Sequence, residues 1–268
     1  MNLQEFAAFH VPALAADEAR FGVPIAALEQ AVATDQPGFR FWHLGAPGHC
    51  AVKTPGYGIL LGDLDRDDCA RLAETVASVD YPGVVGVDLA PPTFVECAAA
   101  TGATFDAPEA MRIHTLVQAP KFPGVAGAAR VATIDDAPLL REWLNAFRAE
   151  ATPRDPPVSR EEIDRAAAGG RYMFWIVNGE PVSMAAVARS LRGSLAIGGV
   201  YTPPELRARG YAGSATAALC QRAFAEGKRF VTLYTDLANP FSNRCYAKIG
   251  FSPWCEAWHF HRRAGTGG

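Results

Sequence analysis

The chain has 268 residues, of which 49% are hydrophobic and 20% are charged, so it can form a packed core without disulfide bonds. The formal net charge of -3 at pH 7 excludes a nucleic-acid binder that acts through general positive charge, although a local basic site is compatible with it. We therefore expect no nucleic acid as a partner. No apolar run approaches the length of a membrane-spanning helix, so we expect no membrane as a partner either.

The cysteines are spread along the chain without a CxxC pair and without the spacing of metal ligands. We therefore expect reduced thiols that act as small apolar side chains, in a protein of the cytoplasm. The N-terminal MNLQEFAAFHVP has no positively charged flank before an apolar core, so a secretory signal is not expected there. The six cysteines are Cys50, Cys69, Cys97, Cys220, Cys245 and Cys255.

Residues 1–118 are rich in Ala, Gly and Pro and predict a smaller α/β domain at the N-terminus. Pro24 suits the first position of a helix, and the acidic Asp63-Leu-Asp65 precedes another helix. Helices are expected at residues 14–20, 24–33, 66–79 and 91–102. Strands are expected at 52–62, 83–89 and 111–118.

The segment APKFPGVAGAAR is dense in Pro, Gly and Ala, and it predicts a linker at residues 119–129. Residues 130–268 then form a second domain with a more regular pattern. Its expected order is β-α-α-β-β-β-α-β-α-β, and it includes an Asn178-Gly179 hairpin turn. His259 and His261 fall on the last of these strands, where we expect half-exposed side chains, and we assign no metal.

The stretch VYTPPELRARGYAG, residues 200–213, joins a predicted strand to a predicted helix. The first N–H groups of a helix have no partner within it, and they lie at the positive end of the helix dipole. Such a turn can bind a phosphate or pyrophosphate. Gly210 and Gly213 lack Cβ atoms where a ligand would approach the backbone.

Side chains of the same stretch favour an anion as well. Arg207 and Arg209 add positive charge and forked donors, and two prolines stiffen the entry to the turn. A purely structural loop stays open as an alternative, because glycines are common near helix starts and loop arginines are often only solvated. The stretch is neither a P-loop of the form GxxxxGK[ST] nor a GxGxxG dinucleotide motif.

Two segments resemble the GNAT superfamily of acyl-CoA-dependent N-acetyltransferases. Residues 207–212, Arg-Ala-Arg-Gly-Tyr-Ala, are similar to the R/Q-x-x-G-x-G/A segment that follows the fourth strand of that family and holds the coenzyme A pyrophosphate. Residues 233–251, with Asn239, Tyr246 and a closing Gly-Phe, resemble the segment from its fifth strand to its fourth helix. The resemblance covers roughly residues 128–263 and accounts for the order of elements.

The resemblance implies an α+β (mixed α/β) fold. The second domain would have a GNAT-like central sheet, mixed but mostly antiparallel, flanked by helices. Two-domain members of this superfamily often carry a degenerate copy of the same fold as their first half, and the resemblance implies this for residues 1–118. Gly198-Gly199 would suit the β-bulge that separates the fourth and fifth strands, and close packing is the alternative reason for two glycines there.

The resemblance also implies acetyl-CoA as cosubstrate and Tyr246 as general acid for the leaving thiolate. A core tyrosine bonded to a backbone carbonyl is the alternative role of Tyr246. Asn239 would bind the pantetheine amide, and capping of the next helix is the alternative role. The implied coenzyme-binding residues are Val200, Tyr201, Thr202, Arg207, Ala208, Arg209, Gly210, Tyr211, Ala212, Gly213, Asn239 and Ser242.

The general base stays open among Glu205, Asp236 and Glu180. Glu205 also fits a solvated loop acid, and Asp236 also fits an Asx turn. The aromatic residues of MFW and PWCEAWHF fit either an acceptor pocket or the core.

The implied activity is N-acetyltransfer from acetyl-CoA to a primary amine of a small molecule or peptide, by direct attack in a ternary complex. The alternative is an acyl-CoA-binding sensor or regulatory protein on the same scaffold without turnover. A third option, a structural partner that binds no ligand, is disfavoured by the intact Arg209, Gly210, Asn239 and Tyr246. The acceptor stays unassigned, and a homodimer stays open.

Overall fold

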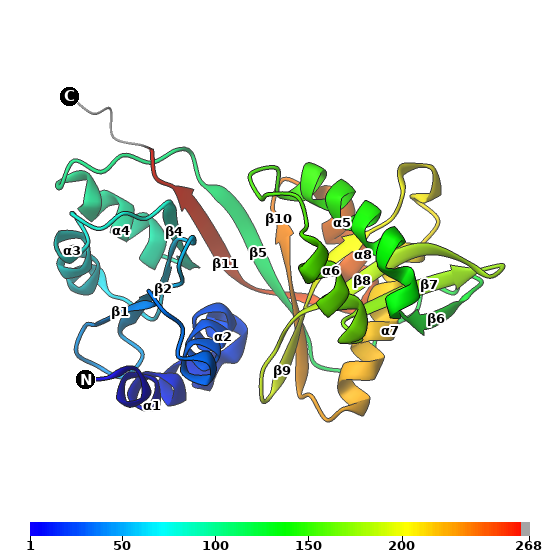
Figure 1. The fold of residues 1–268 in the computed structure, drawn as a ribbon, viewed down its shortest axis with the longest axis horizontal. Coiled ribbons are helices and arrows are strands. Elements are labelled where there is room, and N and C mark those ends of the chain that lie inside the picture. The colour runs from blue at the N-terminus through cyan, green and yellow to red at the C-terminus, as the bar shows by residue number, and fades with distance from the viewer. Residues whose placement is uncertain (264–268) are drawn as a thin grey trace. The chain divides into compact units, whose positions relative to one another are not determined.

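The computed structural model describes residues 1–263 and divides the chain into two compact units (Figure 1). Unit 1 contains Met1–Ile113, Asp236–Ala238 and the chain from Pro253 onward. Unit 2 contains His114–Thr235 and Asn239–Ser252. The predicted domain boundaries at 118 and 130 stay a prediction, and residues 264–268 of the predicted second domain lie outside the described residues.

Unit 1 is an α/β unit. Its sheet order is β1 (Arg40–His43), β2 (Cys50–Lys53), β3 (Ile59–Leu61), β4 (Gly83–Val87), β11 (Ser252–His261) and β5 (Glu109–Leu116). Its helices are α1 (Leu3–Leu14), α2 (Glu18–Thr34), α3 (Arg66–Thr75) and α4 (Ala90–Ala99). β3 and β4 are parallel, whereas β4 and β11 are antiparallel. Leu72 of α3, Phe94 of α4 and Phe260 of β11 lie in one core cluster, so these two helices cover one face of the sheet.

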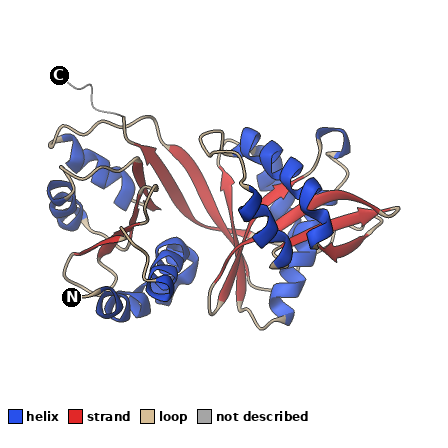
Figure 2. Ribbon diagram, viewed as in Figure 1, coloured by secondary structure: helices blue, strands red, loops and turns tan. Residues whose placement is uncertain are grey.

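Unit 2 is a sheet flanked by helices (Figure 2). Its sheet order is β10 (Phe230–Asp236), β9 (Ser194–Tyr201), β8 (Glu180–Ser190), β7 (Tyr172–Val177) and β6 (Ala128–Val131). Its helices are α5 (Ala137–Ala151), α6 (Arg160–Ala168), α7 (Tyr211–Ala225) and α8 (Pro240–Ile249). Only the β9–β10 pair is parallel among these strands. The element order predicted from residue 130 onward is confirmed along the chain, although its last strand, β11, lies in the sheet of unit 1. The mixed, mostly antiparallel sheet is confirmed as well.

The two faces of this sheet carry separate cores. Alternation along β7 places Phe174 in the cluster with α5 and α6, and it places Met173 and Trp175 in the cluster with α7. All three side chains of MFW are buried, so they belong to the core. Of the second aromatic stretch, Phe260 is buried in unit 1 and Trp254 is exposed, with its indole N–H donating to Asp17.

Three expectations for the N-terminal half are wrong in detail. The pattern missed β1 and α1, although Asn2 and Glu5 form a capping box at the start of α1. Pro24 lies inside α2 and not at its first position. Proline has no backbone N–H to donate within a helix, and the helix is kinked nearby at Phe21, whose backbone is not helical. The strand expected at 52–62 is two strands, because Pro55-Gly56 turns the chain and Gly56 has a φ of 80°.

The cysteines are free thiols, as expected. Burial raises the pKa of the Cys50 and Cys255 thiols to about 12, so both stay protonated at neutral pH and are poor nucleophiles. Among residues 1–263, no helix combines the length and the apolar character needed to cross a membrane.

An ion pair joins β6 to the start of α5. Two guanidinium nitrogens of Arg130 donate to the two carboxylate oxygens of Asp136 at 2.8 Å, and the backbone N–H of Thr133 donates to Asp136 at 2.7 Å. The Arg130 hydrogen bonds, with help from Thr133, lower the pKa of Asp136 from 3.8 to about 2. The ionised carboxylate therefore stabilises the folded chain.

We predict that Asp136→Asn lowers the free energy of unfolding by roughly 2 kcal/mol at pH 7. Because the folded pKa is depressed, this stabilisation is present above about pH 4 and is lost as the pH falls toward 2, so the difference between wild type and variant should shrink there. Urea unfolding between pH 7 and pH 3 measures it. Asp164→Asn, which removes the exposed partner of Arg160, is the control and should change little. An Asp136→Asn difference that is independent of pH would contradict this assignment.

Candidate functional site

The separation of β9 and β10 defines the candidate site. The two parallel strands pair from Ser194–Ile197 against Phe230–Leu233. The pairing then ends, although β9 continues to Tyr201 and β10 to Asp236. On the side of β9 that faces β10, the backbone N–H and C=O groups after Ile197 therefore make no hydrogen bond within this ladder.

A β-bulge accompanies the separation. Met184 pairs with Tyr201 and Ala186 pairs with Gly198, so β9 has one residue more than β8 between these pairs. Gly199 lies within the extra stretch and has a φ of 55°, a conformation that favours glycine. The bulge expected at Gly198-Gly199 is confirmed.

The residues after the bulge are held by β8. Tyr201 and Thr202 are buried, and Val200 is half-buried. The Ser183 hydroxyl donates to the Tyr201 carbonyl at 3.0 Å and lies 2.8 Å from the Thr202 hydroxyl oxygen. Ser183 is a residue that the sequence reasoning missed, because nothing in its neighbours along the chain marks it.

The loop after β9 leads directly into α7. Gly210 is the N-cap residue with a φ of 85°, and no side chain caps the helix. Ala208 also has a positive φ, of 62°. The N–H groups of Tyr211, Ala212 and Gly213 begin the helix, and such groups have no carbonyl partner within it. This helix start has the donors and the dipole that a phosphate needs.

The two arginines of the loop have different environments. Arg207 donates to both carboxylate oxygens of Glu150 on α5 at 2.8 Å, and its Nε donates to the Thr202 carbonyl at 2.9 Å. Arg207 therefore braces the loop. Arg209 is exposed and donates to the Glu205 carbonyl at 3.1 Å, so its charge is accessible to an anion.

The space beside the loop glycines is occupied by the predicted linker. A Cβ atom on Gly210 would lie 3.0 Å from Val125 Cγ1, and one on Gly213 would lie 2.9 Å from Pro123 Cγ. The expectation that these glycines leave room for a ligand at their Cβ positions is therefore corrected, because residues 123–125 fill that room. The N–H groups at the start of a helix point along the helix axis, whereas the Cα–Cβ bonds point mainly outward from it. Filling the Cβ positions of the glycines is therefore a different matter from filling the space in front of the N-terminal amides.

Asn239 caps α8. Its side-chain oxygen accepts hydrogen bonds from the N–H groups of Phe241 at 3.2 Å and Ser242 at 3.1 Å, and Pro240 follows as the first helical residue. The capping role considered from the sequence is therefore present.

Tyr246 lies on α8 and is half-buried. Its ring packs against the α7 core cluster and lies 6.1 Å from the ring of Phe251, centroid to centroid. Burial raises the pKa of the phenol, and the neighbouring thiols Cys245 and Cys220 raise it further. Tyr246 therefore keeps its proton at neutral and mildly alkaline pH.

The three candidate bases have ordinary surface environments. Glu205 and Glu180 are exposed. Asp236 is exposed as well, and its Oδ1 accepts the N–H of Ala238 at 2.7 Å, which is the Asx turn considered from the sequence. The geometry favours none of the three over the others.

The comparisons agree with this geometry. Residues 137–251, which contain α5 to α8 and the separated strands, match the profile of the Acetyltransferase (GNAT) family. This part of the chain belongs to the GNAT superfamily. Its members are acyltransferases that take the acyl group from an acyl-CoA. No curated relative matches the sequence.

Solved GNAT structures share the fold over nearly the whole chain. A GCN5-related N-acetyltransferase from Sphaerobacter thermophilus aligns with a TM-score of 0.62 at 16% identity, over 98% of this chain and 93% of its own. One from Kribbella flavida aligns with a TM-score of 0.59 at 20% identity, over 90% and 96%. A tandem GNAT protein from the clavulanic acid biosynthesis pathway aligns with a TM-score of 0.56 at 15% identity, over 97% and 94%. The two-unit layout is therefore one that GNAT proteins adopt.

We predict that Glu150→Gln loosens the loop at residues 203–209, because Arg207 loses its charged partner. The pair is about half-exposed, with side chains 44% and 50% accessible, so the loss of unfolding free energy should be no more than about 1 kcal/mol. Hydrogen exchange of the loop amides should become faster. Glu226→Gln removes the comparably exposed i,i+4 pair with Arg222 on α7 and serves as the control. Equal exchange at residues 203–209 in both variants would show that Arg207 does not brace the loop.

Proposed function

We propose that this protein transfers an acetyl group from acetyl-CoA to a primary amine of a small molecule or peptide, in the cytoplasm. The observation that carries the proposal is the uncapped start of α7 directly after the point where β9 stops pairing with β10. At this point the chain has first an extended strand whose backbone N–H and C=O groups are unpaired toward β10, and then a helix start of the kind that binds anions. Acetyl-CoA has the matching parts, because its pantetheine arm carries amide groups and is joined to a pyrophosphate.

The residues around this helix start fit the coenzyme. The Ser214 hydroxyl in the first turn of α7 is buried and has no hydrogen-bond partner among residues 1–263, so it is available to a ligand. Under the proposal, Val200, Tyr201 and Thr202 offer backbone groups to the pantetheine arm. The pyrophosphate is bound by backbone groups in the segment Ala208, Arg209, Gly210, Tyr211, Ala212 and Gly213 and by the Arg209 side chain.

Two further residues have divided roles under the proposal. Arg207 positions the loop through Glu150 rather than contacting the phosphates. Asn239 caps α8 through its oxygen, and its amide nitrogen is the group that would donate to the pantetheine, with Ser242 beside it on the first turn.

In the reaction, the neutral amine attacks the thioester carbonyl, a C–N bond forms and the C–S bond breaks. The thiolate of coenzyme A leaves and takes a proton from the Tyr246 hydroxyl, and the proton lost by the amine passes to a base or to water. The Tyr246 phenolate then regains a proton from water, which completes the cycle. The raised pKa of Tyr246 has two effects. It keeps the phenol protonated before each turnover, and it makes the phenol a weaker acid toward the thiolate.

The alternative function is an acyl-CoA sensor without turnover. The observation that favours it is the packing of Pro123 and Val125 against the loop glycines, because a segment in that place could respond to the ligand. Release of free coenzyme A from acetyl-CoA in the presence of a panel of amines distinguishes the two. Amine-dependent release supports the enzyme, and binding without release supports the sensor.

We predict that Gly210→Ala weakens acetyl-CoA binding at least tenfold, because a side chain at this positive φ distorts the turn that presents the α7 amides. The matched control is Gly227→Ala beyond the other end of α7. Gly227 has a φ of 83°, close to the 85° of Gly210, and no atom lies within 4 Å of its added Cβ. Both variants should lose about 1–2 kcal/mol of stability from the left-handed backbone, and Gly210→Ala in addition crowds Val125, whose Cγ1 would lie 3.0 Å from the new Cβ. Calorimetric titration with acetyl-CoA measures the affinity.

Arg209→Gln completes this test without a change in the backbone. It should weaken acetyl-CoA more than S-acetylpantetheine, which lacks the pyrophosphate. Normal acetyl-CoA affinity in both Gly210→Ala and Arg209→Gln would place the pyrophosphate elsewhere.

We predict that Tyr246→Phe lowers kcat by roughly a hundredfold and leaves acetyl-CoA affinity near normal, because the hydroxyl acts only on the leaving thiolate. Steady-state kinetics with a titration of acetyl-CoA separates the two effects. Tyr172→Phe is the control, since burial raises its pKa too and it lies in the α5–α6 core. An affinity loss as large as the rate loss would make Tyr246 a binding or packing residue.

A further inference from the structure

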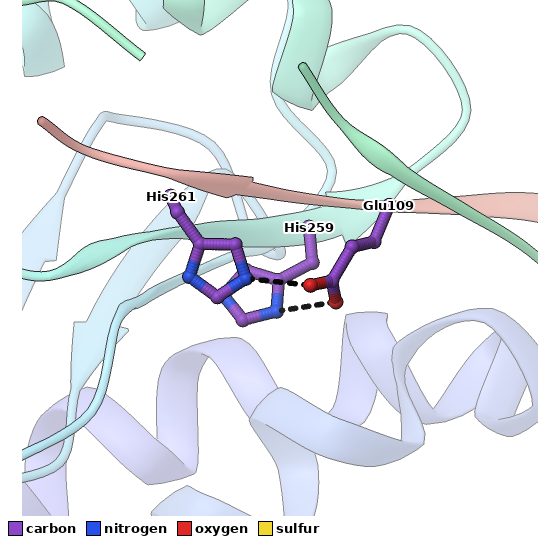
Figure 3. A group of neighbouring side chains, drawn as sticks. All are labelled: Glu109, His259 and His261. Atoms are coloured by element: carbon purple, nitrogen blue, oxygen red, sulfur yellow. Dashed lines mark hydrogen bonds and ion pairs between the residues drawn. The ribbon is translucent and has the colours of Figure 1, made fainter. Parts of the chain in front are cut away.

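Three side chains of unit 1 converge on one side of its sheet (Figure 3). His259 and His261 stand two residues apart on β11, so both point to the same face of the strand. Glu109 begins β5, the next strand in the sheet order. The two rings lie 3.8 Å apart between centroids, and the carboxylate of Glu109 lies against both.

The distances among the nitrogen and oxygen atoms are close to those between ligands of one metal ion. Glu109 Oε1 is 3.0 Å from His261 Nε2, and Glu109 Oε2 is 3.6 Å from His259 Nδ1. One ligand atom from each residue lies within 4.8 Å of the other two. Zinc bonds of about 2.0–2.1 Å in a tetrahedral site separate ligand atoms by about 3.3 Å. The observed separations lie on both sides of that value, so small side-chain rotations would admit the ion.

We propose that Glu109, His259 and His261 bind a divalent zinc ion. Two imidazoles and one carboxylate are a ligand set that zinc uses, and three protein ligands leave a fourth position open to water or another ligand. The rings are partly accessible, with side chains 29% exposed for His259 and 16% for His261, so an ion can reach them. Glu109 is 54% exposed and provides the negative charge.

The backbone that carries the two histidines is paired with β4. His259 pairs with Val85 and His261 pairs with Gly83 on β4. A Cβ atom on Gly83 would lie 2.3 Å from the Phe260 carbonyl oxygen, so the strands approach closely at this point. Ligands on packed strands keep their spacing better than ligands on loops, which favours a defined site.

The second histidine–carboxylate group of unit 1 differs in its charge balance. His49 Nδ1 is 2.5 Å from Asp68 Oδ2, and Asp65 lies nearby. Asp68 also pairs with the Arg71 guanidinium and accepts the N–H of Asp65, so its oxygens already serve the start of α3. A cation there would face Arg71. His49 is therefore the matched control for the proposed site.

The test is zinc titration of the full chain, without an affinity tag and after treatment with a chelator, in competition with a chromogenic zinc indicator. Cobalt as a second probe reports four-coordinate geometry by its visible absorption. The variants are Glu109→Gln and His261→Gln. The controls are His49→Gln and Glu256→Gln, the latter a carboxylate of β11 that pairs with Arg112. Thermal unfolding of each metal-free variant shows that it is folded.

We expect one zinc per chain, with an affinity at least about tenfold weaker in Glu109→Gln and in His261→Gln and unchanged in both controls. No zinc binding by the wild type, or unchanged affinity in either site variant, would overturn the proposal. Equal weakening in His49→Gln would also overturn it, by moving the site to the start of α3. None of these readouts depends on acetyl transfer, so the result is independent of the proposed function.

Discussion

The candidate site depends on where a parallel pair of strands stops pairing. β9 and β10 share a ladder only as far as Ile197 and Leu233, and the extra residue around Gly199 turns the end of β9 out of that ladder. The consequences follow in chain order. Unused backbone groups are left on β9, a short turn follows them, and α7 begins with no side-chain cap. Each of these features would disappear if the ladder continued to Tyr201, because strand pairing and a straight path into the helix would satisfy or bury the same groups.

Local features of the site could be predicted from the sequence, and contacts between distant segments could not. Gly198-Gly199, Gly210 and Asn239 each leave a local signal, since a bulge, a positive φ and an N-cap each favour particular residue types. The pairing of Arg207 with Glu150 leaves no such signal, because Glu150 lies 57 residues away on α5. The same limit applies to Pro123 and Val125, which predict only a linker because their partners, glycines at a helix start, lie far along the chain.

Unit 1 shows the same limit for charged groups. His259 and His261 were expected to be half-exposed on the last strand, and they are. Their neighbour Glu109 cannot be predicted from the sequence, because it comes 150 residues before His259 and meets it only through the sheet order β4-β11-β5. Clusters of this kind form only when strands far apart in the sequence pair with one another. The pattern of residues in a short stretch of the chain carries no information about such pairing. Helices with local caps, such as α3 and its Asp65 N-cap, could be predicted far better.

The segment at 121–126 also limits how the chain can be shortened. The backbone N–H of Lys121 donates to the Ile249 carbonyl at 2.8 Å, and the Trp175 indole donates to the Ala126 carbonyl at 3.1 Å. With Pro123 and Val125 against α7, these residues act as a part of unit 2 rather than as a free tether. A fragment that begins at residue 130, where the sequence suggests a boundary, would expose the side of α7 and leave the indole N–H without its acceptor. A fragment intended for crystallisation or spectroscopy of unit 2 should therefore retain the chain from before Lys121.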